Sequence, residues 1–130
     1  MLSFYTEKFR NGHTRVFKTA WFAKAAGKAR IGDKELCQAI AQAMLGQADD
    51  LGGGVFKKRL NRNDHRSILL AKGGRFWVYA YLFAKKDRAN IGDDELQALR
   101  GLAALYAKKP DADIARDMHH KELLEICHDI

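Results

Sequence analysis

Residues 52–88 read GGGVFKKRLNRNDHRSILLAKGGRFWVYAYLFAKKDR, and the rest of the chain is organised around this stretch. Its strand-forming runs, separated by turn-forming residues, predict three strands in a meander over Val55–Asn61, His65–Lys72 and Arg75–Lys85. Ten basic and two acidic residues give the stretch a formal charge of +8, against +7 for the whole chain. Such a concentration of positive charge indicates a polyanion as partner, most simply nucleic acid.

The glycine and polar clusters between these runs have distinct interpretations. Arg62-Asn63-Asp64 predicts a turn, Gly73-Gly74 predicts a tight hairpin, and Gly52-Gly53-Gly54 is interpreted as a flexible entry to the first strand. The third strand carries apolar or aromatic residues at both its even and its odd positions. We therefore expect it to be central and covered on both faces.

The flanking sequence predicts helices around this meander, and hence an α+β fold. Thr19 is expected to cap one helix, and an Ile-Gly-Asp-x-Glu-Leu module begins two others, at residues 31–36 and 91–96. The expected elements are a strand over Arg15–Lys18, helices over Ala20–Lys28, from Gly32 to Leu45, from Gly92 to Lys108 and over Asp111–Lys121, and a turn or short strand within 122–130. Residues 15–130 form one predicted domain, and residues 1–14 an N-terminal arm or extension.

Composition excludes several classes of protein. A chain of 130 residues with 47% hydrophobic and 30% charged residues is typical of a soluble globular domain. Because no run is long and apolar enough to span a membrane or to serve as a signal peptide, we expect a cytoplasmic protein. Cys37 and Cys127 lie ninety positions apart and are interpreted as reduced thiols rather than as a disulfide.

Strand alternation selects a few of the basic residues as a candidate site. Lys57 and Arg59 share one face of the first predicted strand, because successive side chains of a strand alternate. In a hairpin, Arg66 would approach Arg59, and Lys85 ends the last strand. These four cations are expected to converge on one surface, with Tyr79 and Tyr81 on the same face of the last strand as Lys85.

Such a cluster suits RNA cleavage by internal attack of a 2′-hydroxyl on the adjacent phosphate. That reaction needs a base, cations around the phosphorane and an acid for the leaving oxygen. A lysine crowded by other cations can have a lowered pKa and transfer protons, whereas arginine stays charged and clamps phosphate. Contacts to RNA are expected from six further residues, namely Lys58, Arg62, His65, Tyr81, Lys86 and Arg88.

Structural interpretations compete with this chemistry. Basic residues on an exposed strand also serve as a solvated face or protect an edge, and aromatic residues such as Trp77 and Tyr81 also form core. His65 is either a general acid or an exposed residue beside a turn. The spacing of His119, His120, Cys127 and His128 matches no closed zinc pattern, and no cofactor or metal is predicted.

Four motifs resemble the RelE/ParE toxin superfamily, in particular a RelE-like branch once catalogued only as a domain of unknown function. They are RVFKTAWFAK at 15–24, DLGGGVFKKR at 50–59, HRSI at 65–68 and FAKKDRANIGDDEL at 83–96. The likeness extends from Arg15 to about Tyr106. It implies a toxin of a bacterial type II toxin–antitoxin pair. RelE members cleave mRNA, commonly in the ribosomal A site and without a metal, whereas ParE members inhibit gyrase.

By this resemblance, Lys57 and Arg59 match the basic residues of the second strand of the family. Arg66 matches the phosphate-binding arginine of its third strand, and Lys85 the basic residue that ends its last strand. The family branch usually has a longer glycine-rich loop before the third strand, often with a tyrosine before the arginine, where this chain has His65. The resemblance also implies an antitoxin partner, expected to be a helix-turn-helix protein encoded next to the toxin.

Together these observations predict a metal-independent mRNA endoribonuclease that inhibits translation by acting on ribosome-bound mRNA. Two alternatives stay open at this point: a ParE-like inhibitor of gyrase with the same fold, and a non-catalytic RNA-binding module.

Overall fold

The computed structural model describes residues 14–128, so the predicted arm at the N-terminus lies almost wholly outside the described residues. The elements run in the order β1 (Arg15–Thr19), α2 (Ala20–Lys28), α3 (Asp33–Met44), β2 (Asp49–Gly52), β3 (Val55–Leu60), β4 (His65–Leu70), β5 (Phe76–Ala84), α4 (Asp93–Lys108), α5 (Asp111–His119) and β6 (Leu123–Ile126). The α+β class, the three-stranded meander and the flanking helices are confirmed. No helix in this part of the chain is long and apolar enough to cross a membrane.

All the strands belong to one sheet with the order β2-β3-β4-β5-β1-β6. The meander β3-β4-β5 is antiparallel, β1 pairs with β5 in parallel, and β6 pairs with β1 in antiparallel. The predicted central strand is therefore confirmed, because β5 lies between β4 and β1.

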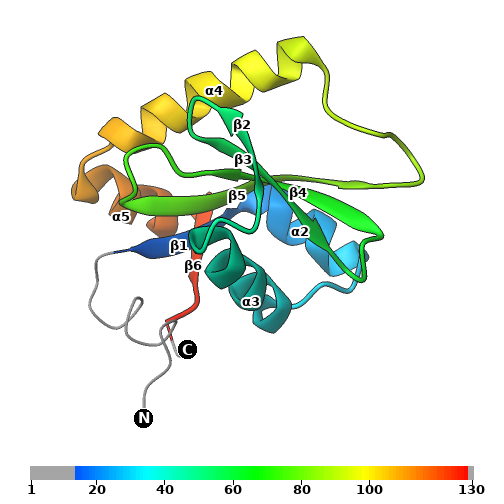
Figure 1. The fold of residues 1–130 in the computed structure, drawn as a ribbon. Coiled ribbons are helices and arrows are strands. Elements are labelled where there is room, and N and C mark those ends of the chain that lie inside the picture. The colour runs from blue at the N-terminus through cyan, green and yellow to red at the C-terminus, as the bar shows by residue number, and fades with distance from the viewer. Residues whose placement is uncertain (1–13, 129–130) are drawn as a thin grey trace.

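Helices cover the sheet on both faces, as Figure 1 shows. One core contains Phe22, Leu36 and Ile40 from α2 and α3, packed against Leu69 and Tyr79 of the sheet. The second core lies beneath α4 and α5 and includes, from these helices and the sheet, Phe17, Val55, Ile68, Phe83, Ala103 and Ile114. The two clusters bury the alternating faces of β5, which explains its double apolar pattern.

The predicted helix starts are confirmed, but the repeated module is used in two ways. Thr19 accepts a hydrogen bond from the Phe22 amide, and Gly32 and Gly92 are the N-caps of α3 and α4. In α4, Glu95 accepts from the Gly92 amide at 2.7 Å. In α3, the equivalent Glu35 instead accepts from the amide of Asn61 in the β3–β4 turn. Glu95 therefore caps the N-terminus of its own helix, whereas Glu35 binds the β3–β4 turn.

The interpretation of the three glycines as a flexible entry is wrong. Gly53 and Gly54 form the turn of a hairpin that joins β3 to β2, a strand that ends at Gly52 and that the sequence analysis missed. Gly54 has φ of +83°, and a Cβ built on it would lie 2.4 Å from the Cβ of Lys72. Glycine is needed there because only a residue without a side chain permits both this backbone conformation and this close approach.

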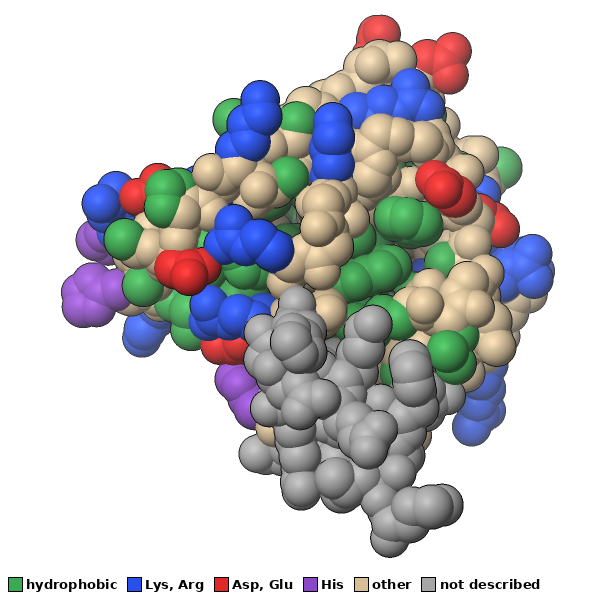
Figure 2. All heavy atoms as spheres, turned by 60° about the vertical axis from the view of Figure 1, so that its left-hand side comes forward, with side chains coloured by type: hydrophobic (Ala, Val, Ile, Leu, Met, Phe, Trp, Pro, Cys, Tyr) green, Lys and Arg blue, Asp and Glu red, His purple; other side chains and the backbone are tan. Residues whose placement is uncertain are grey.

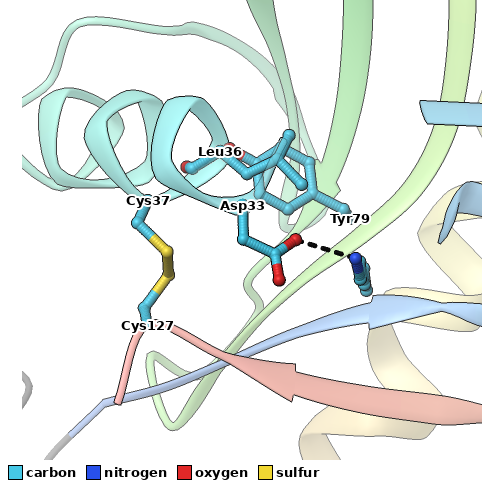
Figure 3. The surroundings of a disulfide bond; sticks show 6 residues. Asp33, Leu36, Cys37, Tyr79 and Cys127 are labelled. Carbon is cyan, nitrogen blue, oxygen red and sulfur yellow. Dashed lines mark hydrogen bonds and ion pairs between the residues drawn. A yellow bond between two sulfur atoms is a disulfide. The ribbon is translucent and has the colours of Figure 1, made fainter. Parts of the chain in front are cut away.

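The prediction of two reduced thiols is also wrong. Cys37 on α3 and Cys127, just after β6, form a disulfide (Figure 3). Sequence separation concealed the pair, because the sheet places β6 beside β1 and so brings the C-terminal segment next to α3. An ion pair between Lys18 of β1 and Asp33 lies close by, at 2.7 Å.

Candidate functional site

Arg59 and Arg66 lie directly opposite each other in the β3–β4 ladder. The same register pairs Lys57 with Ile68, so Lys57, Arg59 and Arg66 all project from the face of the sheet that α4 covers. Paired residues of an antiparallel ladder have Cβ atoms about 5 Å apart, and like charges in such a pair repel each other. The predicted approach of Arg66 to Arg59 is thus present, in a pairing that an anion between the guanidinium groups would stabilise.

Lys57 sits beside this pair in a more enclosed position, with its side chain 17% exposed. Its Nζ lies 3.9 Å from Oδ2 of Asp49 and 3.4 Å from Oδ1 of Asn90. Asp49 belongs to the missed strand β2, and Asn90 to the loop before α4. Two segments outside the meander therefore orient this lysine.

The β3–β4 turn positions Arg66. Asn61, Arg62 and Asn63 all have positive φ values, of 53°, 55° and 73°, and the carbonyl oxygen of Asn63 accepts a hydrogen bond from Nη1 of Arg66 at 2.9 Å. The carboxylate of Glu35 holds the start of the turn through the Asn61 amide. Asn tolerates the left-handed conformation better than most residues, which explains the two asparagines.

Lys85 and His65 lie at the same end of the meander. The Lys85 amide donates to the carbonyl oxygen of Asp64 at 2.8 Å, which ties the end of β5 to the turn. Lys85, Lys86 and His65 line a cavity of about 570 Å³ there. The side-chain nitrogen of Asn61 lies 3.1 Å from Nδ1 of His65 and fixes the ring.

A bulge in β5 overturns the expectation for the two tyrosines. Ile68 pairs with Tyr81 but Leu69 pairs with Tyr79, so Ala80 is an extra residue and alternation is interrupted. Tyr79 therefore points to the α3 side, fully buried, and donates to the carbonyl oxygen of Leu36 at 2.6 Å. Burial raises the pKa of Tyr79 well above its usual value. Of the two tyrosines, only Tyr81 projects from the α4 face of the sheet, where it packs against the core beneath α4.

Arg88, a predicted RNA contact, donates its hydrogen bonds to acceptors within the protein. Nη1 and Nη2 donate to the two carboxylate oxygens of Glu95, and Nε donates to the carbonyl oxygen of Asn90 at 2.9 Å. The guanidinium also lies 5.6 Å from the Phe83 ring centre. Hydrogen bonds from Arg88, and then from the Gly92 amide, lower the pKa of Glu95 to about 2. Arg88 thus clamps the β5–α4 loop to the start of α4.

Lys58 and Arg62, two further predicted RNA contacts, lie apart from the convergent cations. Lys58 is on the α3 side of β3, where its Nζ donates to the carbonyl oxygen of Gln47 at 2.9 Å. Burial, and then the neighbouring Arg59, lowers the pKa of Lys58. Arg62 is exposed in the turn and lines a cavity of about 200 Å³ next to α3.

Charge elsewhere on the protein is more mixed. Figure 2 brings the left-hand side of Figure 1 forward and shows basic side chains spread over this face, with acidic ones among them. Within residues 14–128, no three His, Cys, Asp or Glu side chains are grouped so that they could hold a metal ion.

Sequence reasoning missed Asp49, Asn90 and Trp21 as neighbours of the site. The two acids before the triple glycine were a detectable signal, because a glycine turn flanked by polar residues is typical of a hairpin. Trp21 also had a signal, since it lies outside the buried Phe22–Ala26 stripe of its helix.

Residues 14–126 match the family model described as the RelE toxin of the RelE/RelB toxin–antitoxin system. No curated protein and no solved structure matches the chain. The family match spans most of the sequence, and the chain belongs to the RelE toxin family. Membership implies an antitoxin partner, and the toxins of this family are known for ribonuclease activity.

Proposed function

We propose that this toxin is an endoribonuclease that cleaves ribosome-bound mRNA in the cytoplasm without a metal ion. The observation that carries the proposal is the Arg59–Arg66 pair. Two guanidinium groups on facing positions of neighbouring strands form a site for one phosphate group, with Lys57 beside them on the same face. Arginine suits this role because it stays charged and binds phosphate through two parallel hydrogen bonds.

Cleavage proceeds by attack of a 2′-oxygen on the adjacent phosphorus, with loss of the 5′-oxygen. The products are a 2′,3′-cyclic phosphate and a free 5′-hydroxyl. Arg59 and Arg66 stabilise the charge that grows on the phosphorane, which is the largest contribution expected of fixed cations. Lys57 or Lys85 transfers the protons.

His65 is a second candidate for the proton donor. With the amide nitrogen of Asn61 as donor, Nδ1 of His65 accepts and Nε2 carries the hydrogen. His65 lines the cavity at Lys85, at the end of the meander. In the proposed reaction the leaving oxygen departs towards this cavity.

The direct test compares wild-type toxin with Lys57→Ala and Arg66→Ala. Purified ribosomes programmed with a defined mRNA are treated with each protein, and the fragment ends are analysed chemically. We expect wild-type protein to yield cyclic phosphate and 5′-hydroxyl ends, and each variant to lose at least a hundredfold in rate. Lys34→Ala, an exposed lysine on α3, is the matched control. Cleavage of free mRNA at the same rate would limit the proposal to ribosome-independent action, and unchanged activity of both site variants would refute the site.

A further inference from the structure

A groove beside the candidate site has no part in the chemistry proposed above. It lies between α2 and the C-terminal part of β5, and has a volume of about 680 Å³. This part of β5 follows Tyr79, the last residue of β5 that pairs with β1. The residues that give it its character are Trp21, Lys24, Lys28, His65, Tyr81 and Lys86. It combines aromatic rings with basic side chains, which outnumber the acidic Asp87 that also lines it.

The aromatic part of the groove is a preformed stack. The indole of Trp21 lies on the ring of Tyr81 with centroids 5.0 Å apart and an angle of 23° between the planes. Trp21 is nevertheless 52% exposed, in contrast to Phe22 next to it, which is fully buried. A large indole left half in water contributes little to the core, but it offers a flat surface on which another ring can stack.

Contacts from Arg88 and Phe83 hold the Tyr81 ring of this stack in place. Nη1 of Arg88 lies 3.5 Å from the Tyr81 hydroxyl, and Glu95 fixes that guanidinium from α4. The Tyr81 ring also contacts Phe83, at 5.9 Å between centroids. A ligand that stacks on Trp21 would therefore meet a platform that is already ordered, which reduces the entropy lost on binding.

The charged part of the groove suits a phosphodiester backbone. Lys24 and Lys28 are one turn apart on α2 and so lie on the same side of the helix, and both are exposed. Lys86 adds a third cation from the opposite wall. Proteins usually bind single-stranded nucleic acid with basic residues along its phosphate backbone and aromatic rings that stack on its bases.

The groove adjoins the cavity at Lys85, one of the four candidate cations. His65 and Lys86 line both the groove and this cavity. We propose that the groove is a nucleotide-binding subsite for single-stranded RNA, in which Trp21 stacks on an unpaired base near the cleaved phosphate and Lys24 and Lys28 bind its backbone. This inference rests on the proposed function. An acidic protein segment could also use the lysines, but the lining that the groove shares with the cavity at Lys85 and the open indole favour RNA.

The test measures binding of a fluorescently labelled, fully 2′-O-methylated RNA hexanucleotide to the full chain by anisotropy. This probe has no free 2′-hydroxyl, so it cannot be cleaved and the result does not depend on catalysis. We expect Trp21→Ala to weaken binding roughly five- to hundredfold, and Trp21→Phe to restore most of the affinity because it keeps a stacking ring. The double variant Lys24→Ala/Lys28→Ala should bind more weakly at low salt and lower the salt slope by about 1.4. Lys34→Ala should bind as wild type.

Unchanged affinity of the Trp21→Ala and double-lysine variants would overturn the inference, as would failure of the wild-type chain to bind the probe. If Trp21→Ala weakened only the complex with the antitoxin, the groove would be a protein-binding surface instead. Thermal unfolding of each variant identifies loss of fold, and in that case Trp21→Phe and the lysine variants decide. Failure of the proposed function would appear separately, as intact mRNA after treatment with wild-type protein.

Discussion

Arg59 of β3 and Arg66 of β4 are paired residues of one antiparallel ladder, and they project from the same face of the sheet. Neighbouring like charges oppose folding slightly, so this arrangement has a cost in the free toxin that bound phosphate would remove. The same pair that would stabilise a phosphorane is thus a weak point in the stability of the sheet.

Arg59→Ala should therefore separate stability from activity. We expect the free energy of unfolding to rise by a few tenths of a kcal/mol, because repulsion at the pair is relieved at an exposed position. The rate of mRNA cleavage should fall at least a hundredfold. Denaturant unfolding and cleavage assays on the same preparation check both effects, with Lys34→Ala as control. A variant that is less stable than wild type would contradict the repulsion argument.

The Arg88–Glu95 clamp should make stability depend on acid pH. The pKa of Glu95 is lowered to about 2 from its ordinary value of 4.5, so the folded state favours the ionised carboxylate. This stabilisation is present above pH 4.5 and is lost as pH falls towards 2. Glu95→Gln should be less stable than wild type at pH 6, and the difference should shrink towards pH 2. Unfolding curves at several pH values measure it, and Glu122→Gln, at an exposed position after α5, is the control. A constant difference between Glu95→Gln and wild type would count against the clamp.

The Cys37–Cys127 disulfide should contribute strongly to stability, because it closes a loop across most of the described chain. For a sequence separation of 90, loop-closure entropy predicts a loss of about 4.6 kcal/mol on reduction. Thermal unfolding with and without a reductant measures the loss. The double variant Cys37→Ser/Cys127→Ser should be insensitive to the reductant. Equal melting temperatures of wild-type protein under both conditions would show that the bridge does not form in solution.

Tyr79 and Tyr81 should differ in their roles because of the bulge at Ala80. Tyr79→Phe removes a buried hydrogen bond to Leu36, and we expect a loss of about 1–2 kcal/mol in stability with no change in RNA binding. Tyr81→Ala should weaken binding of the methylated hexanucleotide, because it removes the support of Trp21. An effect of Tyr79→Phe on RNA binding would place its ring, contrary to the structure, on the RNA side.

The sequence predicted the strands of the meander and the helix starts well, because alternation and capping are local properties of the chain. It also predicted that Arg66 would approach Arg59, since the short turn leaves little freedom of register, and the structure pairs the two directly. Features that depend on three-dimensional neighbours were missed: the strand β2, the disulfide, the orientation of Tyr79 and the engagement of Arg88 by Glu95. The extra residue Ala80 places Tyr79 and Tyr81 on opposite faces of the sheet. No local sequence signal reveals such a bulge in a strand that is apolar on both faces.

The central claim is that the facing arginines bind the phosphate that is cleaved, and the nature of the RNA ends tests it most directly. Ribosomes carrying a defined mRNA are treated with wild-type toxin, Arg59→Ala and Arg66→Ala. The account predicts new 2′,3′-cyclic phosphate and 5′-hydroxyl ends with wild-type toxin, and their loss in both folded variants. The same ends at the same rate with both variants, or no new ends with the wild-type toxin, would contradict it.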